Sequence, residues 1–158
     1  MRNLTKHAKK VQEIIYDKGY TNKVVELPDS TRTAKEAASA IGCDVAQIAK
    51  SIVFRLMESN KPLLVIASGA NRIDEKQIEK HLDDKLGKAN ADFVREHTGY
   101  VIGGVPPLGH TEPIQTYIDE DIFQFKDIWA AAGHPKAVVQ LTPDELIEMT
   151  EGTVVAVK

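Results

Sequence analysis

The sequence predicts a fold of helices and strands built on one mixed β-sheet, rather than a regular alternation of strand and helix. Two apolar, β-branched runs at residues 51–57 and 62–67 are separated by the polar segment 58–61, which is typical of a hairpin. Segments with helical spacing or capping residues lie before, between and after the strand-like runs. The 158 residues are expected to form one domain over residues 1–158, long enough to bury a hydrophobic core.

Five segments carry helix signals. The first has apolar residues at helical spacing and a glycine stop, and the second and the last begin with capping-box residues, Thr33 to Glu36 and Thr142 to Glu145. The expected helices run from Leu4 to Gly19, from Thr33 to Gly42, from Asp74 to His81, from Asp92 to His97, and onward from Thr142.

Strands are expected where apolar and β-branched residues cluster between turn-forming residues. The expected strands are residues 23–27, closed by Pro28-Asp29-Ser30, and residues 51–57, 62–67, 114–118, 137–141 and 153–157. Asp44 is expected to cap a short turn toward Ala49. The segment 119–129 fits helix, strand or both.

The composition excludes several classes of protein. Hydrophobic content of 42% and charged content of 27% are ordinary for a globular chain, and no apolar run is long enough to span a membrane. No secretory signal is expected at the basic N-terminus. The single Cys43 excludes an internal disulfide and predicts a reducing, cytoplasmic location, where it serves as a packing residue.

The charge is unevenly distributed. The net charge is −3, which argues against broad affinity for nucleic acid. Residues 1–24 nevertheless hold six Lys and Arg against two Asp and Glu, whereas the remainder holds fourteen against twenty-one. This basic segment is either a solvated helix face or a contact for a phosphate backbone.

A loop rich in glycine and proline follows an apolar run at residues 99–110. Three glycines and two prolines fall within residues 103–109, a combination that gives a stiff backbone with accessible N–H groups. It is either an elaborate turn or a ligand-binding loop. The phosphate-binding loop of nucleotide hydrolases, the dinucleotide-binding glycine motif and the strand-to-helix serine elbow of hydrolases are all absent.

Lysine and histidine supply the other candidate residues. Lys50 precedes a strand-like run, where it is either a solvated edge residue or a charge at a pocket mouth. His110 and His134 each follow a glycine and are either exposed loop residues or pocket residues. No two histidines have ligand spacing on a helix, and none lies near Cys43, so neither a metal nor a cofactor is expected.

Four segments together resemble the YbaK family, also called the prolyl-tRNA-synthetase-associated editing domain. They are Ala49-Lys-Ser-Ile-Val-Phe54, Ser68-Gly-Ala-Asn-Arg-Ile-Asp-Glu-Lys76, Gly99 to His110, and Trp129-Ala-Ala-Ala-Gly-His-Pro135. The resemblance covers nearly the whole chain. It implies an α+β fold with a curved, barrel-like mixed β-sheet, flanking helices and a pocket on one side.

The resemblance also implies a function. Members of the family hydrolyse, in trans, the ester of a wrong amino acid on tRNA, typically Ala, Cys, Ser or Thr on tRNA for proline. By this resemblance Lys50 is the catalytic residue. The implied partner is the aminoacylated end of tRNA, and an aminoacyl-tRNA synthetase is an alternative second partner. The implied substrate-binding residues are Ser51, Ser68, Gly103, Gly104, Pro107, Gly109, His110, Gly133 and His134.

One departure from the family concerns specificity. Members of the YbaK type read Gly-Gly-x-Ser-Pro-x-Gly-Gln in the loop, whereas this chain has Pro106 in place of Ser and His110 in place of Gln. The amino acid that is removed is therefore left open.

The resemblance is compatible with chemistry that needs no metal. A positioned water attacks the activated ester, assisted by the ribose hydroxyl or the amino group of the substrate, while loop N–H groups stabilise the oxyanion. Lys50 either holds the terminal nucleotide or polarises the carbonyl. Two alternatives are a non-catalytic module that binds an aminoacyl or nucleotide group or docks on a synthetase, and a small-molecule esterase.

Overall fold

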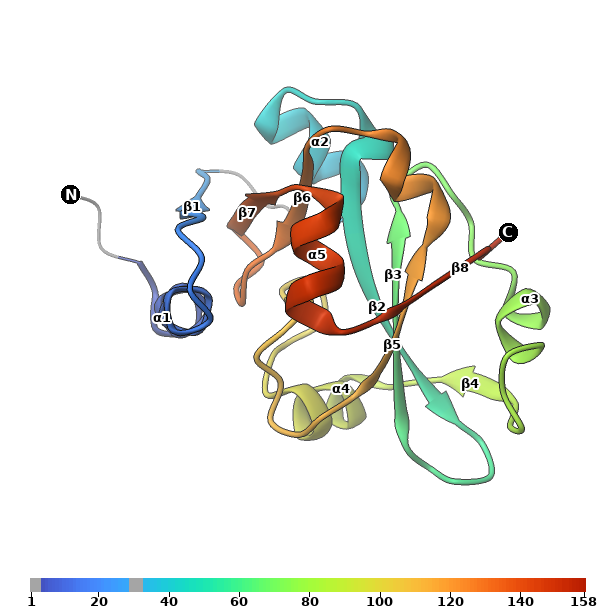
Figure 1. Cartoon of the computed structure of the whole chain (residues 1–158). Helices are drawn as coiled ribbons and strands as arrows, with labels where there is room; N and C mark the ends of the chain where they lie inside the picture. The colour runs from blue at the N-terminus through green and yellow to red at the C-terminus, as the bar shows by residue number, and fades with distance from the viewer. Residues whose placement is uncertain (1–3, 29–32) are drawn as a thin grey trace.

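The computed structural model describes residues 4–28 and 33–158, which form five α-helices, two short 3₁₀ helices and eight strands (Figure 1). The α-helices are α1 (Lys6–Asp17), α2 (Ala34–Ile41), α3 (Glu75–Glu79), α4 (Ala91–Thr98) and α5 (Pro143–Thr150), and the 3₁₀ helices are η1 (Val45–Gln47) and η2 (Glu120–Gln124). The strands are β1 (Val24–Glu26), β2 (Ile48–Leu56), β3 (Pro62–Ser68), β4 (Leu86–Lys88), β5 (Gln115–Asp119), β6 (Ile128–Ala131), β7 (Ala137–Leu141) and β8 (Thr153–Val155).

All eight strands belong to one mixed sheet, in the order β1-β7-β6-β2-β3-β5-β8, with β4 paired to β2. The long β2 is central: it pairs antiparallel with β3 along its length, parallel with β6 near its start, and antiparallel with β4 near its end. The expected hairpin of β2 and β3 and the α+β fold on a mixed sheet are thereby confirmed.

Strand β3 shows how the sequence places the core. All seven of its residues are buried, and alternate side chains enter two different hydrophobic clusters. Leu64 and Ile66 pack in the cluster that contains side chains of α1, α4 and α5, whereas Leu63, Val65 and Ala67 pack with Ile78 of α3. A strand covered on both faces reads as a continuous apolar run, which explains why residues 62–67 were recognisable as a strand.

Capping residues fix where the helices begin. The side chain of Thr142 accepts a hydrogen bond from Glu145 N while the Glu145 side chain accepts from Thr142 N, so the predicted capping box of α5 is confirmed. Thr33 likewise accepts from Glu36 N at the start of α2. Both signals are local, and the sequence alone therefore reveals them.

Four points of local structure differ from the sequence predictions or add to them. The predicted strand at 51–57 begins three residues earlier, at Ile48, so Lys50 lies inside β2 instead of before it. The ambiguous segment 119–129 forms both η2 and β6. The short β4 was not predicted, because three residues carry no readable alternation and their pairing with β2 is a tertiary effect. In the expected Pro28-Asp29-Ser30 turn, residues 29 and 30 lie outside the described residues.

Within residues 4–28 and 33–158, no helix combines the length and the apolar character that crossing a membrane would require.

Candidate active site

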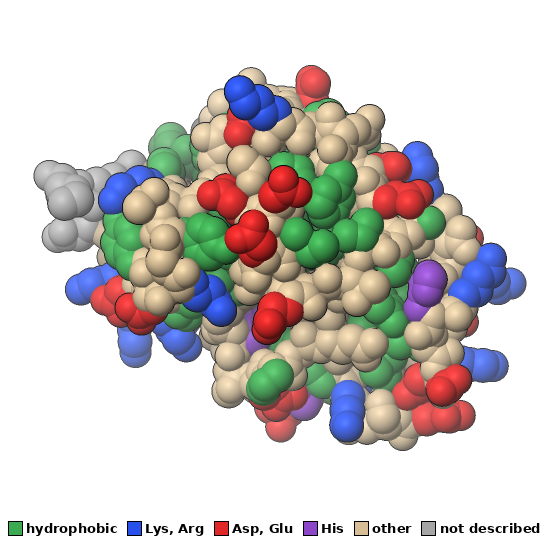
Figure 2. All heavy atoms as spheres, viewed as in Figure 1, with side chains coloured by type: hydrophobic (Ala, Val, Ile, Leu, Met, Phe, Trp, Pro, Cys, Tyr) green, Lys and Arg blue, Asp and Glu red, His purple; other side chains and the backbone are tan. Residues whose placement is uncertain are grey.

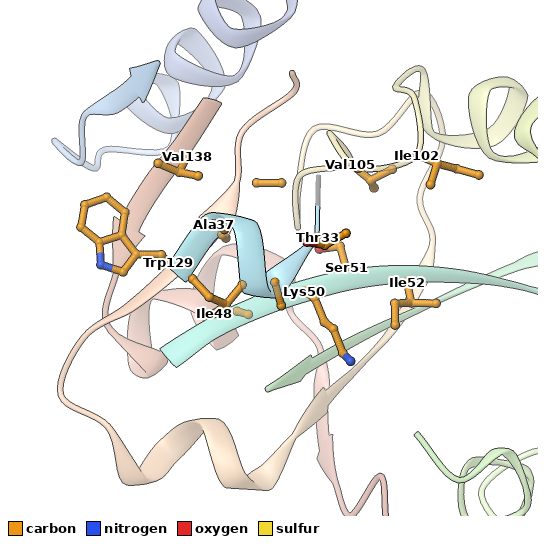
Figure 3. A pocket seen from close by; sticks show the side chains of 15 residues that line it. Thr33, Ala37, Ile48, Lys50, Ser51, Ile52, Ile102, Val105, Trp129 and Val138 are labelled. Atoms are coloured by element: carbon orange, nitrogen blue, oxygen red, sulfur yellow. The ribbon is translucent and has the colours of Figure 1, made fainter. Parts of the chain in front are cut away.

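A cavity of about 340 Å³ opens where β2 begins (Figure 3). Its walls come from the start of β2, from α2, from β6 and β7, and from the glycine-rich loop. The lining residues are Thr33, Ala34, Ala37, Ile48, Ala49, Lys50, Ser51, Ile52, Ile102, Gly103, Val105, Trp129, Ala130, Ala131 and Val138. Most of these side chains are apolar, so the cavity suits a small group with an apolar side chain.

Lys50 and Ser51 are neighbours on β2, and their side chains extend to opposite sides of the strand (Figure 3). The Lys50 ammonium donates a hydrogen bond of 2.9 Å to the backbone carbonyl of Asn71, in the loop after β3. Burial lowers the pKa of Lys50, and the nearby Asp119 carboxylate acts in the opposite direction. Lys50 is therefore a partly desolvated cation at the rim of the cavity.

The Ser51 hydroxyl is the buried side-chain polar atom without a hydrogen-bond partner among the described residues. A buried hydroxyl normally finds a partner, because leaving it unpaired costs free energy. Ser51 also lines the cavity. Its hydroxyl is thus available to a polar group of a bound ligand.

The glycine-rich loop reaches the cavity through Gly103 and Val105. Gly103 has a φ of 90°, which a glycine adopts without strain. Gly104 N–H donates to Val101 O at 2.9 Å and is not available to a ligand. No backbone acceptor within the described ranges receives the N–H of Gly103 or of Val105, so both groups are unpaired in residues that line the cavity.

Gly104 has a packing role. Its carbonyl accepts a hydrogen bond from Gly133 N, and a methyl group at this position would lie 3.0 Å from the backbone carbonyl carbon of His134. Only a glycine allows the two loops to approach this closely. Of the loop glycines expected to bind substrate, Gly103 therefore lines the cavity and Gly104 joins two loops.

Three other loop residues lie elsewhere. Pro107, Gly109 and His110 line a separate open groove of about 960 Å³ beside α1 and α5. His110 Nε2 lies 2.7 Å from Pro106 O, and burial lowers the pKa of the imidazole. A neutral ring that donates to a carbonyl of its own loop stiffens that loop. His110 therefore has a structural contact here and does not line the cavity.

Gly133, His134 and Ser68 also lie outside the cavity lining. Gly133 packs against α1, and the Nδ1 atom of His134 accepts from Lys136 N within a turn. Ser68 is 1% exposed, and its hydroxyl donates to Ala46 O at 2.7 Å. The resemblance implied that Gly133 and His134 bind substrate, whereas here the cavity is lined by Trp129, Ala130 and Ala131 just before them.

Sequence reasoning missed the small residues that shape the cavity. Ala37 and Ala34 present one side of α2 to it, and Ala130 and Ala131 present β6. Alanine carries no chemical signature, so no motif could have singled them out. The one available signal was the helix start at Thr33, which places α2 next to the beginning of β2.

A second cavity of about 570 Å³ adjoins the first. Ser51, Ile52, Ile102, Gly103 and Val105 line both cavities. The glycine-rich loop and the middle of β2 thus lie between two adjoining spaces. Within the described ranges, no group of three His, Cys, Asp or Glu side chains is placed to hold a metal ion.

The fold and the cavity define an α+β domain with a preformed site for a small, mainly apolar group. The model of the aminoacyl-tRNA editing domain family matches residues 28–149. The chain therefore belongs to the aminoacyl-tRNA editing domain family, and the resemblance drawn from the sequence is confirmed. Its activity is that of a deacylase, a hydrolase acting on the ester of aminoacyl-tRNA.

Individual proteins agree with this family. The chain is 34% identical over 129 residues to the uncharacterized protein YwhH of Bacillus subtilis (strain 168), covering 82% of both chains. It is 25% identical over 121 residues to EbsC of Enterococcus faecalis (strain ATCC 700802 / V583), a candidate Cys-tRNA(Pro)/Cys-tRNA(Cys) deacylase, covering 76% of this chain and 73% of the other. The crystal structure of a candidate trans-editing enzyme for prolyl-tRNA synthetase superposes with a TM-score of 0.92, at 44% identity and 99% coverage of both chains.

Proposed function

We propose that this chain removes a small amino acid from mischarged tRNA for proline, and that the reaction takes place at the cavity where β2 begins. The observation that carries the proposal is that one cavity is lined by Ser51, whose hydroxyl has no partner among the described residues, by Gly103 and Val105, whose N–H groups have no backbone acceptor there, and by Lys50. The names of EbsC and of the candidate trans-editing enzyme support the choice of tRNA.

The amino-acid side chain enters the cavity between α2 and β6. Ala37 and Ala130 give this space apolar walls without filling it, so a side chain of modest size is desolvated there. The Ser51 hydroxyl then meets the amino group or the ester of the substrate, which satisfies an atom that is otherwise buried without a partner.

Hydrolysis needs an oxyanion site and a water. As water attacks the ester carbonyl, negative charge develops on the carbonyl oxygen, and backbone N–H groups held in place by a stiff loop stabilise it. Gly103 and Val105 supply these groups. The water adds to the carbonyl carbon, and its proton is relayed through the neighbouring ribose hydroxyl or the substrate amine to the leaving ribose oxygen. The C–O bond then breaks, which releases the free amino acid and the tRNA end with its hydroxyl restored.

The direction of the Lys50 side chain favours one of its two expected roles. The ammonium extends to the side of β2 opposite to Ser51, so it is displaced from the point where Ser51 meets the aminoacyl group (Figure 3). One of its three N–H donors is used by Asn71 O, and the others are left for an anion. Lys50 is therefore assigned to the terminal phosphate of the tRNA, where it fixes the position of the ester relative to the loop.

A deacylation panel tests the proposal. The amino acids Ala, Cys, Ser, Thr and Pro are each charged on tRNA for proline and on their cognate tRNAs, and ester loss is followed with and without the protein. Hydrolysis of at least one mischarged tRNA for proline, with Pro-tRNA spared, is expected. Binding without turnover would favour a non-catalytic module, and turnover of free amino-acid esters but not of tRNA would favour a small-molecule esterase.

Filling the cavity should change the substrate preference. In Ala37→Leu the added side chain enters the cavity from α2 and takes up space that a larger substrate side chain needs. Removal of Thr or Cys should therefore fall at least about tenfold relative to removal of Ala, because a pocket that is too small by one methylene group discriminates by about that factor. The ratio of kcat/KM values for the charged tRNAs measures it. Ala40→Leu is the matched control, since Ala40 lies on the same helix but does not line the cavity. An unchanged ratio in Ala37→Leu would place the amino acid elsewhere.

The basic helix α1 is proposed as a contact for the tRNA stem. Lys6, Lys9 and Lys10 are exposed, and Lys and Arg side chains surround α1, whereas acidic side chains gather on the face that carries α5 (Figure 2). Neutralising these three lysines should raise KM for tRNA, and each lost phosphate contact should reduce the log–log salt slope by about 0.7–0.9. Turnover of a minimal aminoacyl-nucleotide should stay unchanged because it lacks the stem.

The control for this experiment changes the same charge elsewhere. Lys76, Lys80 and Lys85 are also exposed and lie on or next to α3, across the molecule from α1 (Figure 1). Their replacement should leave the salt slope as it is. If the α1 triple variant keeps the wild-type slope as well, the basic segment is a solvated helix face only.

A further inference from the structure

A buried polar cluster lies under Lys50, on the side of β2 away from the Ser51 hydroxyl. It contains Ser68 at the end of β3, the loop that follows up to residue 71, and the turn where β5 passes into η2. The Lys50 ammonium is bound to this cluster by its hydrogen bond to Asn71 O. The position of Asn71 therefore determines the position of the ammonium.

Asp119 is the centre of the cluster. It is the last residue of β5 and is 1% exposed. One carboxylate oxygen, Oδ2, accepts from Ser68 N at 3.0 Å and from the Asn71 side-chain amide at 2.8 Å, and Oδ1 accepts from Asp121 N at 2.9 Å. A buried carboxylate is stable only when its oxygens are satisfied in this way.

The rest of the loop is fixed from the other side. Ser68 Oγ donates to Ala46 O, and Gly69 N donates to Ile48 O at 2.7 Å. A methyl group at Gly69 would come within 2.4 Å of Val45 O, so the loop lies directly on η1. Asn71, at the end of the loop, has its side chain bound to the carboxylates of Asp119 and Asp121.

Asp119 acts on Lys50 through its charge as well as through its hydrogen bonds to the loop. Desolvation lowers the pKa of the ammonium, and the Asp119 carboxylate raises it. No carboxylate within the described ranges forms a direct ion pair with Lys50; Asp121 pairs with Lys158 at 3.2 Å on the far side of Asn71. Asp119 is thus the charged group that favours the protonated form of Lys50.

We propose that Asp119, acting through Asn71, is the positioning residue that holds the Lys50 ammonium at the rim of the cavity. This inference rests on the proposed role of Lys50 and extends it by naming what keeps that lysine in place. Asp119 itself touches no substrate. Its replacement acts on the reaction through the direction and the charge of Lys50.

The test compares Asp119→Asn with Glu120→Gln. The first variant keeps the shape of the side chain and removes its charge, and the second removes the same charge from the exposed neighbouring residue. Asp119→Asn should lower kcat/KM for a mischarged tRNA by about tenfold to a hundredfold, as a small misplacement of a binding group does. Glu120→Gln should behave as wild type.

A second readout separates positioning from a merely structural effect. The ammonium must be protonated to hold a phosphate, so activity falls as pH rises through the Lys50 pKa. Without the carboxylate that raises this pKa, the fall should begin at a lower pH in Asp119→Asn. NMR titration of ¹³Cε-labelled lysine, with the Lys50 signal assigned by its absence in Lys50→Ala, measures the same displacement in the free protein without any substrate.

Asn71→Ala keeps the experiment decisive if Asp119→Asn folds poorly. Asn71 is half-buried in a loop, and its loss frees the carbonyl that binds Lys50 while Asp119 stays in place. It should also lower kcat/KM, because the ammonium is no longer held in place. Wild-type kinetics in folded Asp119→Asn or Asn71→Ala, or an unmoved Lys50 titration in Asp119→Asn, would overturn the inference. Full activity of Lys50→Ala would instead overturn the proposed role of Lys50, so the two failures are distinguishable.

Discussion

Lys50→Ala is expected to reduce kcat/KM for mischarged tRNA about 10²–10³-fold, the loss seen when a preorganised electrostatic group is removed from an active site. The fold should survive. Burial lowers the pKa of Lys50, so the charged ammonium is less favourable in the folded protein than in the unfolded chain, and losing this charge offsets the loss of its hydrogen bond to Asn71 O. Deacylation kinetics and a thermal melting curve measure the two effects.

Two controls accompany this prediction. Lys61→Ala removes a lysine from the exposed turn between β2 and β3 and should be silent in both measurements. Lys50→Ala should still bind uncharged tRNA through α1, with a log–log salt slope smaller by about 0.7–0.9, because the one phosphate contact of Lys50 is lost. Near-wild-type turnover by Lys50→Ala would remove Lys50 from the reaction.

Gly133→Ala is expected to lower the free energy of unfolding by about 2–4 kcal/mol, the sum of a left-handed backbone cost and an overpacking cost. Gly133 has a φ of 95°, and a methyl group there would lie 2.7 Å from His7 O in α1. The backbone of α1 cannot yield as a flexible side chain could. Denaturant unfolding measures the loss, and activity below the transition should fall far less than in Lys50→Ala.

Gly42→Ala separates the two costs. Gly42 has a similar φ of 87°, but within the described structure no atom lies within 4 Å of the position of an added methyl group. It should therefore show the backbone cost alone, about 1–2 kcal/mol. An equal loss of unfolding free energy in Gly133→Ala and Gly42→Ala would contradict the close contact between Gly133 and α1. A large loss of activity in Gly133→Ala without loss of stability would return Gly133 to the substrate-binding role that the resemblance implied.

The parts of the fold that were predictable are those with local signals. The capping residues Thr33 and Thr142 fixed two helix starts, and the apolar run of β3 marked a strand buried on both faces. The start of β2 and the existence of β4 depend on pairing with distant strands, which no local pattern records. Tertiary contacts decided these elements.

The candidate site divides in the same way. Lys50, Ser51 and Gly103 were named from motif and resemblance, and the structure brings them to one cavity. His110 was named on the same grounds, but it lies in a separate groove, because its ring turns back to its own loop. Asp119 was not among the candidate residues, since the sequence does not reveal that the end of β5 is covered by the loop after β3.

The most direct test of the central claim is to locate the substrate on the protein. An analogue of aminoacyl-adenosine with an amide in place of the ester cannot be hydrolysed by the proposed reaction at a useful rate, so its complex can be followed by backbone amide NMR. The amide signals of Ser51, Gly103 and Val105 are expected to shift on binding, and those of the groove beside α1 should not. Saturable shifts at Gly109 and His110, with Ser51 and Gly103 unmoved, would contradict the placement of the reaction at the start of β2.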